Sequence, residues 1–117
     1  INYDELTGLM NRHFVLVKLN ECLNTEDIEY NGCAIIRVLD LAKINQVNGR
    51  EFGDLLLKLV ANQINILVQS KNQGFVGRLS NTDFIVIFAH ENLENFIQNI
   101  VIRNTHYLGQ KGSIECL

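Results

Sequence analysis

Residues 75–89 read FVGRLSNTDFIVIFA, and the fold is best predicted by starting from this stretch. Two runs rich in β-branched and aromatic residues, Phe75–Leu79 and Asp83–Ala89, flank the polar triplet Ser80-Asn81-Thr82. Two such runs joined by a short polar connection are typical of a β-hairpin. The stretch therefore predicts two antiparallel strands with a tight turn between them.

Helical and strand patterns alternate on both sides of this hairpin. Before it, apolar residues at helical spacing predict a long helix from about Glu51 to about Ser70. Its apolar stripe consists of Leu55, Leu56, Leu59, Val60, Ile64, Leu67 and Val68. The other expected elements are a helix at Arg12–Asn24 with Asn11 as N-cap, a buried strand at Cys33–Leu39, a short helix at Leu41–Val47, a helix at Glu91–Arg103 and a strand that starts at Ser113.

This order of elements predicts the fold class α/β (α+β). The arrangement that suits it is a ferredoxin-like, palm-like antiparallel sheet with helices packed on it. Within this arrangement we expect Leu16, Leu19 and Leu23 to face inward from the first helix. Cys33 opens an apolar run, so we expect it to be a small core residue.

Composition narrows the class of protein. The chain has 117 residues, 47% of them hydrophobic, which is enough for one domain with its own core. No apolar run approaches the roughly 18 residues of a membrane span, so direct membrane insertion is not expected. Ten basic against thirteen acidic residues, with a formal net charge of −3, cannot provide a nucleic-acid footprint. Nucleic acid is therefore not an expected partner.

The cysteine content indicates a cellular compartment, and the first residue indicates a longer parent protein. Cys22, Cys33 and Cys116 lack the spacing of metal ligands and fit a reducing compartment. We therefore expect a cytoplasmic domain, either in a cytoplasmic protein or on the cytoplasmic side of an inner-membrane protein. The chain does not begin with Met, so we expect residues 1–117 to be a single domain cut from a larger multidomain protein.

Three segments resemble a known family. Asp4–Arg12, DELTGLMNR, resembles the D-x-L-T-G-L-x-N-R opening of GGDEF domains, the diguanylate cyclase family. Ile44–Asp54, INQVNGREFGD, resembles the family's I-N-D-x-x-G-H-x-x-G-D, and Arg78–Phe84, RLSNTDF, lies where the family has R-x-G-G-D-E-F. The resemblance implies the GGDEF fold, C-terminally truncated here. We also expect Asp4 and Arg12 to hold the opening turn against the body of the domain.

The resemblance implies a reaction, but the residues depart from it. Active members of the family condense two GTP molecules into cyclic di-GMP with Mg²⁺ bound by carboxylates of the first strand and of the signature. Here Arg37 and Leu39 stand at the two strand positions, and Thr82 stands at the signature acid. The complete signature is degenerate, with Ser80, Asn81, Thr82, Asp83 and Phe84.

The replacement of a metal-binding acid by Arg37 has an electrostatic consequence. A guanidinium about 4 Å from a divalent ion, at an effective dielectric constant of about 20, is repelled by roughly 8 kcal/mol. We therefore expect no bound metal, no other cofactor and no cyclase activity by this domain. Arg37 itself is costly if buried unpaired, and two readings stay open. It either pairs with Asp40 or Asp83, or it binds phosphate.

Two further family sites can be followed in the sequence. The resemblance implies guanine contacts by Asn45 and Asp54, because an amide and a carboxylate together can pair with a guanine edge. Asp54 also suits the first turns of a helix, and Asn45 also suits a turn, so a purely structural role stays open for both. The family's inhibitory R-x-x-D corresponds to residues 71–74, where Lys71 and Gly74 replace Arg and Asp. We do not expect cyclic di-GMP to bind there.

Three functions follow from the resemblance. The first is a catalytically inactive GGDEF domain that acts as a regulatory or interaction module in bacterial cyclic di-GMP signalling. Its partners would be a neighbouring EAL or sensory domain of the same protein, or a second copy in a homodimer. The alternatives are an active diguanylate cyclase with unusual ligands, and a GTP-binding allosteric module that controls a linked EAL phosphodiesterase domain.

Overall fold

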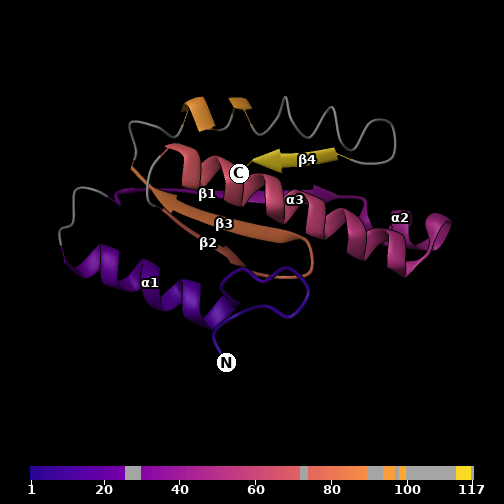
Figure 1. Ribbon diagram of the computed structural model, residues 1–117, viewed down its shortest axis with the longest axis horizontal. Coiled ribbons are helices and arrows are strands. Elements are labelled where there is room, and N and C mark those ends of the chain that lie inside the picture. The colour runs from indigo at the N-terminus through magenta and orange to yellow at the C-terminus, as the bar shows by residue number, and fades with distance from the viewer. Residues whose placement is uncertain (26–29, 72–73, 90–93, 97, 100–112, 117) are drawn as a thin grey trace.

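The elements of the computed structural model follow the order expected from the sequence (Figure 1). The structure describes every residue except 26–29, 72–73, 90–93, 97, 100–112 and 117, and it describes the backbone alone at 70–71 and 113–116. The elements are α1 (Arg12–Asn24), β1 (Gly32–Leu39), α2 (Leu41–Asn48), α3 (Arg50–Lys71), β2 (Phe75–Arg78), β3 (Asp83–Phe88) and β4 (Ser113–Cys116). Most of the expected helix Glu91–Arg103 lies outside the described residues, although 94–96 and 98–99 are helical.

The strands form one antiparallel sheet in the order β2-β3-β1-β4. The predicted hairpin is the β2–β3 pair, and β1 lies between β3 and β4. Helices cover both faces, with α1 on one and α2 and α3 on the other (Figure 1). The predicted fold class is therefore confirmed.

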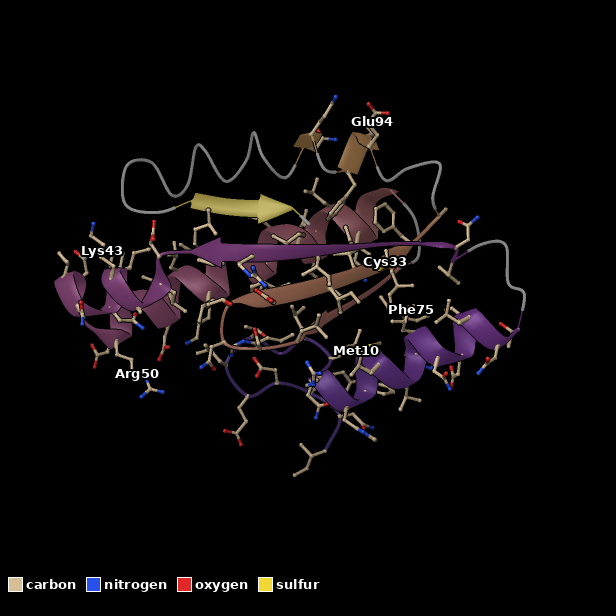
Figure 2. All side chains as sticks on the ribbon, turned by 180° about the vertical axis from the view of Figure 1, so that it is seen from behind. Met10, Cys33, Lys43, Arg50, Phe75 and Glu94 are labelled. Carbon is tan, nitrogen blue, oxygen red and sulfur yellow. The ribbon has the colours of Figure 1, made fainter. Side chains whose placement is uncertain are left out.

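The two faces of β1 have different surroundings. Ala34, Ile36 and Val38 are at most 2% exposed, and they lie on the face covered by α2 and α3. The alternate residues lie on the α1 face, where Cys33 is exposed. The expectation that Cys33 belongs to the core is wrong, because α1 packs mainly on β2 and no described helix crosses β1 on that side (Figure 2).

Helical periodicity located the helices more reliably than their inward faces. In α1 the buried residue is Val15, whereas Leu16 and Leu23 are exposed. In α3, Leu55 and Leu59 of the expected stripe are exposed, and Leu57 and Ala61 are buried instead. The true inward face is rotated, because both the sheet and α2 pack against α3.

Gly77 of β2 allows α1 to lie close to the sheet. A methyl group at this position would overlap the side chain of Val15, which is fully buried. We therefore expect Gly77→Ala to lower the free energy of unfolding by about 1–3 kcal/mol, because α1 must move away from β2. Urea denaturation measures this, with Asn20→Ala on the exposed side of α1 as the control. Wild-type stability of Gly77→Ala would contradict the close packing of α1 on β2.

Candidate functional site

The N-terminal segment runs beside the hairpin and extends the sheet locally. The backbone N–H of Met10 donates to the carbonyl of Val76 at 3.3 Å, and the N–H of Arg78 donates to the carbonyl of Met10 at 2.9 Å. Arg12 donates from Nη1 to the carbonyl of Leu79 at 3.0 Å. The opening motif and the hairpin, almost seventy positions apart, are therefore held side by side.

Asp4 and Arg78 form the central contact of this segment. Arg78 Nη1 lies 3.2 Å from Asp4 Oδ2, which also accepts from the backbone and hydroxyl of Thr7 at 3.0 and 2.7 Å. Burial alone would raise the pKa of Asp4, but the hydrogen bonds from Thr7 and Arg78 outweigh it and hold the pKa below its ordinary value. Arg78 donates its remaining nitrogens to the carbonyls of Ser80 and Asn81, both at 3.1 Å.

Arg37 of β1 pairs across the sheet with Asp83 of β3. The two residues are register partners, and Arg37 Nε and Nη2 donate to Asp83 Oδ1 and Oδ2 at 2.9 and 3.0 Å. Of the two carboxylates that the sequence left open, Asp83 is therefore the partner. Thr82 Oγ1 also donates to Asp83 Oδ1 at 2.9 Å. The hydrogen bond from Arg37 is the main reason why the pKa of Asp83 is lowered.

Ser80 accepts hydrogen bonds from backbone amides of the hairpin loop. Its Oγ accepts from the backbone N–H groups of Thr82 and Asp83 at 3.3 and 3.1 Å. The N–H groups of Leu79 and Ser80 donate to the carbonyl of Asp83 at 2.8 and 3.3 Å. Four backbone donors of residues 79–83 are thus satisfied within the hairpin, where a phosphate-binding loop would present them outward.

A cavity of about 460 Å³ opens where the N-terminal segment, α2, α3 and the hairpin meet. The lining residues are Leu6, Leu41, Asn45, Arg50, Asp54, Leu57, Arg78 and Asn81. It brings together Asn45 and Asp54, the two residues singled out for guanine contacts. Asn45 Oδ1 is buried and has no hydrogen-bond partner. This oxygen packs against Gly53 and has almost no accessible surface, so a ligand in the cavity would meet another part of the Asn45 side chain.

Gly53 provides the space that Asn45 occupies. A methyl group at residue 53 would overlap the amide of Asn45. Sequence reasoning missed Gly53, Arg50 and Leu6 as parts of the site. Gly53 and Arg50 lie within the motif 44–54, one and four residues before Asp54, and this spacing was the available signal. Leu6 could be found only from the path of the N-terminal segment.

Asn81 of the degenerate signature also lines the cavity, whereas the other singled-out residues are not part of its lining. Leu39 is half-buried at the end of β1, and Phe84 is fully buried in the core. Gly74 packs tightly against the backbone of Ile87, and the side chain of Lys71 lies outside the described residues. The expectation that cyclic di-GMP does not bind at residues 71–74 stays a prediction.

The sequence and the fold agree with one family. The family model "Diguanylate cyclase, GGDEF domain" matches residues 1–112. The chain belongs to the GGDEF domain family. Signaling protein YkoW of Bacillus subtilis is 34% identical over 95 residues, which are 78% of this chain and 11% of that protein. Diguanylate cyclase DgcS of Shewanella oneidensis is 33% identical over 88 residues, 73% of this chain and 29% of that protein. The chain thus spans less than a third of either relative.

Solved structures agree on the fold. The GGDEF domain of FimX from Pseudomonas aeruginosa has a TM-score of 0.83 at 17% identity and covers 99% of this chain and 77% of that one. The S helix-GGDEF-EAL portion of Vibrio cholerae LapD, bound to c-di-GMP, has a TM-score of 0.82 at 19% identity, with coverage of 98% and 27%. At these identities the likeness establishes the GGDEF fold alone.

The donor set of this GGDEF domain does not fit the family's Mg²⁺. Both oxygens of Asp83 are occupied by the guanidinium of Arg37, and a magnesium ion needs oxygen ligands in octahedral geometry. Within the described part of the chain, no group of three or more His, Cys, Asp or Glu side chains could hold a metal ion. Among the same residues, no helix is long and apolar enough to cross a membrane.

The lowered pKa values of Asp4 and Asp83 make the stability of the fold depend on pH. Both pKa values lie below the ordinary 3.8, so the folded state gains stability from these groups above that pH and loses it as the pH falls through the lowered values. We expect the free energy of unfolding, measured with urea, to fall between pH 5 and pH 3. The Asp4→Asn/Asp83→Asn variant should be less stable at pH 5 and should lose less on acidification. A loss as large as in the wild type would contradict the assignment.

Proposed function

We propose that this chain is a catalytically inactive GGDEF domain that acts as a regulatory module in bacterial cyclic di-GMP signalling. Membership of the GGDEF family supports a role in cyclic di-GMP signalling. The relative named as a diguanylate cyclase and the similar LapD structure, which is bound to c-di-GMP, support the same role. The observation that carries the inactivity is the bidentate ion pair between Arg37 and Asp83.

The ion pair opposes cyclase chemistry in two ways. Condensation of two triphosphates in this family depends on divalent ions that neutralise phosphate charge, and Arg37 puts a cation at the strand position of one metal ligand. It also engages the carboxylate of the degenerate signature, while Thr82 replaces the signature acid with a hydroxyl. Among the residues whose side chains the structure describes, no cluster of three or more His, Cys, Asp or Glu could replace the lost metal ligands.

A regulatory role requires a mechanical connection, and the N-terminal segment provides one. Leu6 lines the cavity, and Asp4 holds Arg78, which also lines it. A displacement of this segment would therefore change the walls of the cavity directly. In this proposal the partner is a neighbouring EAL or sensory domain, or a second copy of the chain. The LapD structure, in which a GGDEF domain adjoins an EAL domain, supports the first type of partner.

A second candidate function is binding of a guanine nucleotide such as GTP as an allosteric ligand. The observation that favours it is that Asn45 and Asp54 line the same cavity. The Asp54 carboxylate can accept from the ring N–H and amino group of guanine, and the Asn45 amide can pair with another atom of the same base.

We expect the purified chain to make no cyclic di-GMP from GTP with Mg²⁺ or Mn²⁺, because the groups that would hold the ions are replaced or paired. Chromatography of the reaction products tests this, with DgcS as the active control. Product above background that depends on the metal ion would contradict the proposed inactivity and favour an active cyclase with unusual ligands.

We expect Asn45→Ala and Asp54→Ala each to weaken guanine-nucleotide binding about tenfold or more, which corresponds to the loss of roughly 1.4 kcal/mol. Calorimetric titration with GTP measures the affinities. Asn62→Ala, an exposed position of α3 away from the cavity, is the matched control and should bind like the wild type. Equal affinities in all four proteins would place the nucleotide elsewhere.

A further inference from the structure

We propose that the cavity takes a short guanine nucleotide, a monophosphate, without any metal ion, and that Arg50 is the cation that meets its phosphate. This inference rests on the proposed guanine binding and deepens it by naming the ligand class. It differs from the metal-bound triphosphate that the resemblance implies for active members of the family.

The end of the site that would hold a metal-bound triphosphate is filled by the protein's own groups. Arg37 and the hydroxyl of Thr82 occupy the carboxylate of Asp83. Ser80 Oγ takes the backbone donors of residues 82 and 83. Additional phosphates would have to break these hydrogen bonds, so they contribute little net affinity.

The cavity itself remains suited to a small ligand. Its volume of about 460 Å³ falls within the range of roughly 300–1,000 Å³ that is typical of small-molecule sites. Leu6, Leu41 and Leu57 provide apolar walls, and the other five lining residues are polar or charged. Such a mixed lining can hold a planar base together with one anionic group.

Arg50 is the available cation at this cavity. The guanidinium nitrogens of Arg78, the other arginine of the lining, are all engaged by Asp4, Ser80 and Asn81. Arg50, in the first turn of α3, is exposed, and no carboxylate among the described residues forms an ion pair with it. In Figure 2 its side chain projects outward from the end of the molecule where α2 and α3 meet. Arginine can bind a phosphate with two parallel hydrogen bonds, and this needs no metal ion.

The test is calorimetric titration of the complete chain with guanosine, GMP and GTP, each with magnesium and with EDTA. We expect GMP to bind, GTP to bind within about threefold of GMP, and magnesium to change neither affinity by more than about threefold. A magnesium-dependent preference of about tenfold or more for GTP would overturn this inference and leave the proposed guanine binding intact. Failure of all three compounds to bind would overturn both.

Variants test the role of Arg50 separately. Arg50→Gln should weaken GMP about tenfold and leave guanosine unchanged, whereas Arg50→Lys should retain most of the affinity. Lys43→Gln removes an exposed cation of α2 outside the cavity lining and should bind GMP like the wild type. Urea denaturation of each variant establishes that it is folded. An equal loss of GMP and guanosine affinity in Arg50→Gln, or an equal effect of Lys43→Gln on GMP, would overturn the assignment of the phosphate to Arg50.

Discussion

The bidentate pair between Arg37 and Asp83 is the interaction on which the character of this domain depends. It joins the central strands β1 and β3 at the register position next to the β2–β3 hairpin loop. The same contact fixes the carboxylate that the Thr82 hydroxyl also binds. One ion pair, with its arginine about half exposed, therefore adds only modestly to stability but neutralises the Asp83 carboxylate at this end of the sheet.

The junction of α2 and α3 has a different character. At the junction of α2 and α3, Gly53 leaves space for Asn45, whose buried oxygen has no partner, and Asp54 stands in the same cavity. One part of the site, at the hairpin, is filled by the protein's own hydrogen bonds. The other part, at the α2–α3 junction, is a cavity. This asymmetry is the basis of the proposal that the domain is regulatory and binds guanine.

The sequence predicted the helices, the strands and the hairpin because hydrophobic period and turn residues are local properties. It was wrong about Cys33, Leu55 and Leu59, because a period identifies a face without saying which neighbour covers it. In the site, the motifs indicated Asn45 and Asp54, and the isolated charge of Arg37 required a partner. The hydrogen bonds of Ser80 and the free position of Arg50 depend on how distant segments meet, which no local pattern contains.

The most direct measurement is an anomalous difference map from crystals of this chain soaked in Mn²⁺. If the guanidinium of Arg37 excludes divalent ions, the map will contain no manganese peak within coordination distance of Thr82 or Asp83, and the ion pair will be intact. A manganese ion bound to the Asp83 carboxylate, with Arg37 displaced from it, would contradict the account.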